Sequence, residues 1–248
     1  MNITAEKITA IKTDAEFEKS ALEIFYFQYK NCDVYRQFCD ILKINSSEIK
    51  SVKQIPFLPI EFFKTHEVRS LTPNPSPKER GTENAKIFLS SGTTDSVQSK
   101  HYVSDVSVYE QSFRKGFEHF YGDIEDYCLL ALLPSYLERE GSSLVYMVDD
   151  LIKRTKNPDS GFYLHNLNEL SEKLKRFDEN NQKYILLGVT YALLDLAEII
   201  ESPLRGVGGL VMETGGMKGK RKELLLSLIH ISEPTRLRRI SYAVFCLK

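Results

Sequence analysis

Residues 128–133 read Cys128-Leu129-Leu130-Ala131-Leu132-Leu133, an unbroken apolar run that ends at Pro134. A short run of this kind is typical of a strand that is covered on both faces, as in a parallel sheet. A second run, Tyr184-Ile185-Leu186-Leu187-Gly188-Val189, has the same character. The two runs therefore predict buried strands in an α/β core.

Helical and strand patterns alternate around these two runs. Shorter strands are predicted at 86–89, 162–164 and 209–212, and a helix follows the second run as far as Ile200. The other helices are predicted from apolar residues at helical spacing, namely Val106, Tyr109, Phe113, Phe117 and Phe120; Leu144, Val145, Val148, Leu151 and Ile152; and Leu167, Leu170, Leu174 and Phe177. This alternation predicts a mostly parallel sheet with helices on both faces.

The N-terminal residues 1–68 predict a helical cap that precedes this sheet. Thr13 and Glu16 have the spacing of a capping box at a helix start. Two helical faces follow, one with Phe17, Ala21, Ile24 and Phe25 and one with Val34, Phe38, Ile41 and Leu42. Pro56 and Pro59 then predict an extended, buried connector.

Two further segments differ from the rest of the chain in composition. Residues 69–84 contain three prolines and a glycine at close spacing, which predicts a solvated, inserted loop. The α/β core then runs over 85–225. Residues 226–248 resemble a translated sequencing adapter, so we expect a gene product that is truncated after Leu225 and a C-terminal segment without a natural role.

Overall composition excludes several classes of protein. Among 248 residues, 33 Lys and Arg stand against 34 Asp and Glu, a net charge of -1 that argues against a nucleic-acid binder. No apolar run approaches the ~20 residues of a membrane span. The N-terminus has no apolar signal core, and neither a C-x-x-C pair nor a His/Cys cluster occurs. We therefore expect a cytoplasmic protein without a dedicated metal centre.

The loops at the carboxyl ends of the predicted strands are where a site is expected, because ligands of parallel sheets bind there. These loops follow Leu89, Leu133, Val189 and Met212. The first contains Ser90-Ser91-Gly92-Thr93-Thr94 and, six residues further on, Lys100. Hydroxyls and the backbone N–H groups of a tight turn can form an anion-binding nest, and Lys100 adds a mobile positive charge for phosphate.

This loop resembles the phosphate loop of the adenylate-forming superfamily, whose pattern is S/T-S-G-T-T-G-x-x-K. Three further segments, 55–64, 132–144 and 213–219, resemble one family more closely, the LuxE-type acyl-protein synthetases. The resemblance implies an adenylate-forming-enzyme-like fold and a long-chain fatty acid ligase. Such an enzyme uses ATP and Mg²⁺ to convert a fatty or other carboxylic acid to acyl-AMP, and then passes the acyl group to a protein thiol. The implied partner is an acyl-reductase or acyltransferase subunit.

The resemblance also implies roles for individual residues. Contacts with the β- and γ-phosphates of ATP are implied for Ser90, Ser91, Gly92, Thr93, Thr94 and Lys100, of which Lys100, Thr93 and Thr94 are the predicted catalytic residues. Contacts with adenine and the acyl group are implied for Glu213, Thr214, Gly215 and Gly216, where the glycines would let a flat ligand approach the backbone. A plain strand-to-helix turn is the alternative for this glycine pair. Tyr136 and Tyr191 are candidates for lining the acyl pocket, with a role as core aromatics as the alternative.

One residue departs from the superfamily pattern and keeps other functions open. Asp95 stands where the pattern has glycine, and its carboxylate would repel phosphates unless Mg²⁺ or Lys100 offsets the charge. A non-catalytic acyl- or nucleotide-binding protein is therefore one alternative. An acyl-CoA ligase resembling phenylacetate-CoA ligase is another. The family's ribose-binding acid and acyl-accepting cysteine would lie beyond Leu225, so we expect the chain as given to be inactive.

Overall fold

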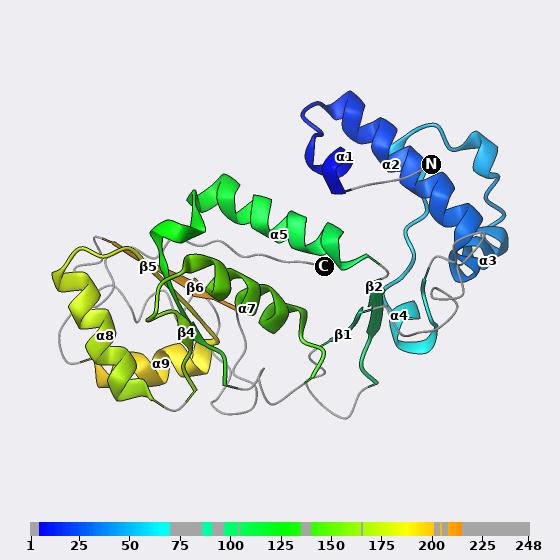
Figure 1. Cartoon of the computed structure of the whole chain (residues 1–248). Coiled ribbons are helices and arrows are strands. Elements are labelled where there is room, and N and C mark those ends of the chain that lie inside the picture. Colours follow the sequence, from blue (N-terminus) through cyan, green and yellow to red (C-terminus); the bar gives the residue numbers. More distant parts are fainter. Residues whose placement is uncertain are drawn as a thin grey trace, which may run out of the picture. The chain divides into compact units, whose positions relative to one another are not determined.

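The computed structural model describes residues 5–69, 86–90, 97–103, 105–134, 140–164, 166–200, 204 and 208–214. The chain divides into two compact units, Met1–Gly116 and Phe117–Lys248. Figure 1 labels the helices and strands of both units. Residues 70–84 of the predicted insert and the adapter-like segment 226–248 lie outside the described residues.

Helices fill the first part of the N-terminal unit, as predicted. They are α1 (Ala5–Thr9), α2 (Asp14–Asn31), α3 (Asp33–Ile41) and α4 (Phe62–Thr65), and the short 3-10 turns η1 (Ser46–Glu48) and η2 (Val52–Gln54) lie between α3 and α4. The capping box at the start of α2 is confirmed. The Glu16 backbone N–H donates to Thr13 Oγ1 at 3.3 Å, and the Thr13 N–H donates to Glu16 Oε2 at 3.0 Å.

The core of these helices is smaller than the apolar pattern predicts. Its buried residues are Phe25, Cys32, Tyr35, Cys39 and Ile49. Phe17 is 55% exposed and Ile41 is 79% exposed. Phe17 precedes Phe25 by about two helical turns, and Ile41 is the last residue of α3, so both lie at helix ends away from the buried cluster.

The predicted connector after η2 is irregular but not buried. Phe57 is 76% exposed and Ile60 is 54% exposed. Only part of the segment turns inward, with Ile55 and Leu58 against the helical core. The prediction of a buried connector is therefore wrong at these two exposed positions.

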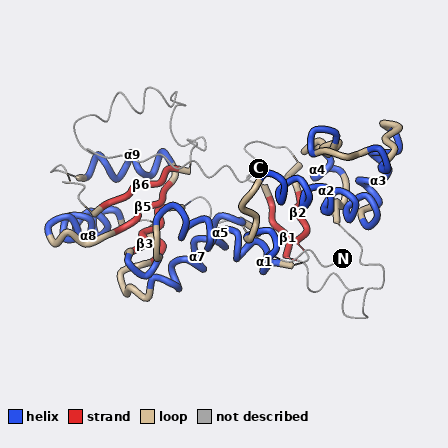
Figure 2. The backbone as a smooth tube through the Cα atoms, turned by 90° about the horizontal axis from the view of Figure 1, so that it is seen from above, coloured by secondary structure: helices blue, strands red, loops and turns tan. Residues whose placement is uncertain are grey.

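Strand β1 (Lys86–Leu89) is present as predicted, but it does not join the parallel sheet. It pairs antiparallel with β2 (Lys100–Val103), and Leu89 lies opposite Lys100 in the two-stranded sheet. Figure 2 shows β1 and β2 as a separate pair of strands. The expectation that the loop after Leu89 leaves the carboxyl edge of the parallel sheet is wrong, because β1 belongs to a two-stranded antiparallel sheet with β2 and not to the four-stranded sheet. Helix α5 (Val106–Tyr121) follows β2.

The second unit contains a parallel four-stranded sheet, which confirms the predicted α/β class. Its strands are β3 (Cys128–Leu132), β4 (Gly161–Phe162), β5 (Tyr184–Gly188) and β6 (Gly209–Glu213), in the order β4-β3-β5-β6. Every residue of β3 and β5 is buried. The two apolar runs of the sequence therefore form the adjacent central strands of the sheet.

Three helices connect these strands, and a short 3-10 turn, η4 (Ile124–Asp126), precedes β3. Helix α7 (Ser143–Thr155) leads from β3 outward to β4, whereas α8 (Leu167–Glu179) and α9 (Thr190–Ile199) lead in the opposite direction across the sheet. Because such crossovers are right-handed, α7 belongs to one face of the sheet and α8 and α9 to the other. Contacts between α8 and α9 agree with this arrangement.

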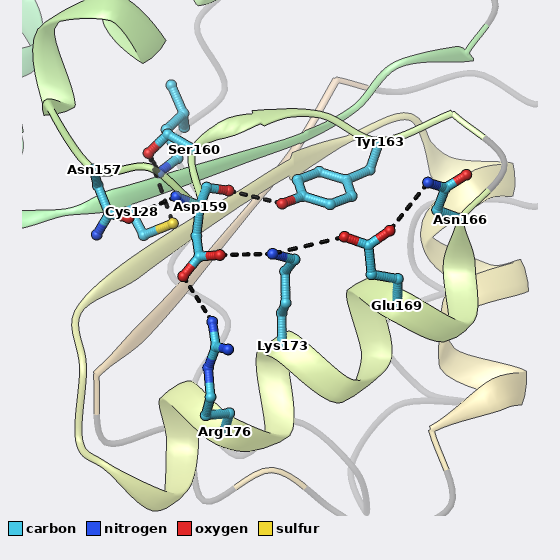
Figure 3. Close-up of polar contacts among 10 residues, drawn as sticks. Cys128, Asn157, Asp159, Ser160, Tyr163, Asn166, Glu169, Lys173 and Arg176 are labelled. Carbon is cyan, nitrogen blue, oxygen red and sulfur yellow. Dashed lines mark hydrogen bonds and ion pairs between the residues drawn. The ribbon is translucent and has the colours of Figure 1, made fainter.

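An ion-pair cluster fixes the loop between α7 and β4. Asp159 accepts hydrogen bonds at 2.6 Å from Lys173 Nζ and from Arg176 Nη2, both on α8 (Figure 3). The Tyr163 hydroxyl donates to the Asp159 carbonyl at 2.7 Å. The hydrogen bond from Lys173 is the main cause that lowers the pKa of Asp159, and Arg176 adds to it.

We expect Asp159→Asn to lower the free energy of unfolding by about 1 kcal/mol at pH 7, since two partly exposed ion pairs are lost. A lowered carboxyl pKa stabilises the fold above the unfolded-state value of about 4, and this contribution disappears as the pH falls through the folded value. Urea unfolding at pH 7 and pH 3 measures the difference.

Asp149→Asn serves as the control, because Asp149 forms an exposed ion pair with Lys153 one helical turn away. A destabilisation by Asp159→Asn that is equally large at both pH values would contradict the electrostatic explanation.

Candidate functional site

The order in which the chain adds strands to the sheet reverses between β3 and β5. The chain leaves β3 toward β4 on one side and leaves β5 toward β6 on the other. In open parallel sheets, ligands bind at such a switch point, outside the carboxyl ends of the strands. The described residues here are Leu133 and Pro134 after β3, Val189 and Thr190 after β5, and Thr214 after β6.

Two polar side chains from neighbouring segments meet at this edge. Thr190, the first residue of α9, is 3% exposed, and its hydroxyl donates a hydrogen bond to Oε1 of Glu213 at the end of β6. The Thr214 N–H donates to the Gly188 carbonyl at 2.9 Å, which fixes the backbone next to Glu213. One hydrogen bond therefore holds the Glu213 carboxylate at the carboxyl edge, and another fixes the backbone beside it.

Gly188 lets α9 approach the end of β5 closely. A Cβ atom at this position would lie 2.7 Å from Cδ2 of Leu193 and 3.3 Å from the Leu132 carbonyl oxygen. The absent side chain therefore lets Leu193 pack directly on the strand, one turn after Thr190.

Tyr191, a predicted acyl-pocket residue, is buried in the first turn of α9. It is 8% exposed. Its position beside Thr190 places it near the switch point, and its contact with an acyl chain stays a prediction. Tyr136, Gly215 and Gly216 lie outside the described residues.

The predicted phosphate loop belongs to the first unit, where its two ends are joined. The Ser90 N–H donates to the Ser99 carbonyl at 3.0 Å, and the Ser99 N–H donates to Ser90 Oγ at 2.9 Å. Lys100 is exposed and lies opposite Leu89 in the sheet. Ser91, Gly92, Thr93, Thr94 and Asp95 lie outside the described residues.

The predicted site residues thus fall into two groups in different units. Ser90 and Lys100 belong to the first unit, whereas Glu213 and Thr214 belong to the second. The expectation that both groups flank one nucleotide stays a prediction. Thr190 was not among the predicted site residues, although the loop after Val189 was. Its signal is a hydroxyl side chain that directly follows a buried strand.

The three described thiols are poor candidates for accepting an acyl group. Cys32, Cys39 and Cys128 are free and buried. Burial raises the pKa of Cys39, and it raises the pKa of Cys128 to about 11. These two thiols therefore stay protonated near neutral pH, whereas the thiolate is the reactive nucleophile.

The described residues contain no group of three or more His, Cys, Asp or Glu side chains placed to hold a metal ion. None of the described helices has the length and apolar character that crossing a membrane requires.

Comparison with known proteins gives one match. Residues 8–124 match the model of a family described as acyl-protein synthetase, LuxE. No curated protein and no solved structure matches the chain. The matched residues run from the end of α1 through the predicted phosphate loop to η4, so they contain Ser90 and Lys100 and stop before β3.

We expect Gly188→Ala to lower the free energy of unfolding by about 1–3 kcal/mol, because the new methyl group forces Leu193 away from the strand. Chemical denaturation of the variant measures this change. Gly161→Ala in β4 is the matched control, since a Cβ there would meet nothing within 4 Å. Gly161→Ala should therefore keep or slightly raise the stability, since alanine lowers the entropy of the unfolded chain. Equal losses for the two variants would contradict the close approach of Leu193 as the reason for glycine at 188.

Proposed function

Because residues 8–124 belong to the acyl-protein synthetase family LuxE, we propose that the protein uses ATP to activate a fatty or other carboxylic acid as acyl-AMP. A carboxylate oxygen of the acid attacks the α-phosphorus of ATP, the bond to the bridging oxygen of the β-phosphate breaks, and pyrophosphate leaves. A thiolate then attacks the acyl carbon, and AMP leaves with the bonding electrons. The family match is the observation that carries this proposal.

The loop that begins at Ser90 is the proposed phosphate site. The Ser90–Ser99 hydrogen bonds fix the two ends of this loop relative to each other. Negative charge accumulates on the phosphoryl oxygens during the first step, and fixed donors and cations aimed at those oxygens stabilise it. Lys100 supplies one positive charge at the end of the loop.

Mg²⁺ would neutralise part of the triphosphate charge. The described residues contain no ready cluster of metal ligands. Mg²⁺ in nucleotide-binding enzymes is commonly held by one or two carboxylates together with substrate phosphates and water. We therefore expect the phosphate oxygens and water to supply most of its ligands here.

The acyl acceptor is proposed to be a thiol other than the three described ones. Cys39 and Cys128 are buried with raised pKa values, and Cys32 is 1% exposed. The acceptor is then a thiol outside the described residues or one on a partner such as an acyl-reductase or acyltransferase subunit. The same burial favours coenzyme A as a second candidate acceptor, which would make the protein an acyl-CoA ligase.

The full-length protein is expected to bind ATP and, with a suitable acid, to release pyrophosphate and form an acyl hydroxamate when hydroxylamine traps the product. Lys100→Ala should weaken ATP binding or lower kcat/KM by about 10²-fold, in the range seen when a donor to developing charge is removed. Isothermal calorimetry, a pyrophosphate assay and a panel of acids of increasing chain length provide the measurements.

Lys53→Ala is the control, because Lys53 is an exposed lysine of the same unit outside the loop. Absence of ATP binding by the wild-type full-length protein would refute the proposal. Binding without pyrophosphate release would support a nucleotide-binding protein in its place, and Asp95→Gly should then tighten the binding. Formation of an acyl-CoA when coenzyme A is added would indicate coenzyme A as the acceptor, whereas an acyl-protein formed without coenzyme A would indicate a protein thiol.

A further inference from the structure

We propose that Phe63 of α4 is a positioning residue for Lys100, which it fixes through a ring stack with His101 on strand β2. This inference rests on the proposed function, in which Lys100 contacts phosphate, and adds two residues to it. All three residues belong to the first unit, so the inference is independent of the second. The proposed function assigns no role to the segment 55–64, which contains Phe63.

Helix α4 contacts two different elements through adjacent phenylalanines. The Phe62 ring makes an edge contact with the Phe38 ring of α3, with 5.6 Å between the ring centroids. The Phe63 ring is stacked on the His101 ring of β2, with 4.6 Å between the centroids and 20° between the planes. Successive side chains of an α-helix point about 100° apart, so neighbours in sequence can reach different elements. Helix α4 therefore links α3 to β2, beside which it lies in Figure 1.

Strand β2 depends on contacts outside its own sheet, because that sheet is small. It contains only β1 and β2, and two strands alone are marginally stable in water. On β1, Phe88 is 6% exposed and contacts the Tyr109 ring of α5 at 5.3 Å. His101 lies opposite Phe88 in the antiparallel register, so both side chains are on one face of the sheet. Phe63 thus supports β2 as Tyr109 supports β1.

Lys100 precedes His101 and lies on the other face of the sheet, since successive residues of a strand alternate between faces. Phe63 therefore acts on Lys100 through the backbone of β2. Burial lowers the pKa of His101, so its ring is uncharged at neutral pH and does not repel Lys100. A fixed backbone beneath a long lysine side chain reduces the conformational freedom that is lost when the lysine binds a ligand. The stack therefore favours phosphate binding by Lys100.

Binding of inorganic tripolyphosphate to the full-length protein tests this role, because the probe has only the phosphate groups of ATP. Phe63→Leu keeps an apolar side chain and removes one ring of the stack, and His101→Ala removes the other ring. We expect each to raise the Kd about threefold to tenfold, the range that corresponds to the loss of one aromatic pair. His101→Phe keeps two stacked rings and should stay within about twofold of wild type. Isothermal calorimetry at neutral pH provides the measurement.

A double variant shows whether Phe63 acts through Lys100. Lys100→Ala should raise the Kd for tripolyphosphate at least about tenfold, as for the loss of a hydrogen bond from a charged group. Phe63→Leu/Lys100→Ala should stay within about twofold of Lys100→Ala alone, because the lysine that Phe63 positions is already absent. Losses that multiply in the double variant would contradict the positioning role.

Phe62→Leu is the matched control for a purely structural effect. It makes the same change at the adjacent residue, whose ring contacts those of Phe38 and His66. This variant should lower the melting temperature without changing the Kd for tripolyphosphate. An equal rise in Kd for Phe62→Leu and Phe63→Leu would show that general loosening of α4 weakens binding, and would overturn the inference.

Unchanged affinity in a folded Phe63→Leu variant, together with the loss expected for Lys100→Ala, would overturn this inference and leave the proposed function intact. Should Phe63→Leu fail to fold, His101→Ala and His101→Phe decide between the same outcomes. If the wild-type protein binds ATP but not tripolyphosphate, the same variants are compared by their Kd for ATP. Absence of binding of both ligands by the wild-type full-length protein would instead overturn the proposed function, and this inference with it.

Discussion

Complete burial of two adjacent parallel strands is the constraint on which the second unit depends. Every residue of β3 and β5 is buried, so the backbone donors and acceptors of both strands need partners within the protein. Each strand pairs with the other and with one outer strand, β4 or β6. Apolar side chains on both faces also require helices on both sides. The same arrangement brings the ends of β3, β5 and β6 to one edge, where Thr190 and Glu213 meet.

Elements whose periodicity reflects burial could be predicted from the sequence. The apolar runs at 128–133 and 184–189 became β3 and β5, and the stripe that contains Leu170, Leu174 and Phe177 became the buried face of α8. Strand β2 was missed because Lys100–Val103 is short and largely polar. The sheet to which β1 belongs was also predicted wrongly, since periodicity reports the burial of a strand and not the identity of its neighbour.

The candidate site could be predicted only as a set of loops. The ends of β3, β5 and β6 were predicted to within one residue, and this placed Glu213 and Thr214 at the carboxyl edge. Thr190 was not identified, because a hydroxyl residue after a buried strand is common at helix starts and does not by itself indicate which side chain it will contact. Its contact with Glu213 follows from the register that sets Gly188 opposite Glu213, and register depends on pairing between distant segments.

Two hydrogen bonds between Ser90 and Ser99 join the end of β1 to the start of β2. Because these bonds join the two strands, a change in the length of the connection between them would cost little free energy of loop closure. Natural variation can therefore alter what the loop recognises without a matching cost in folding. New specificity would therefore be expected to arise through changes between Ser90 and Ser99.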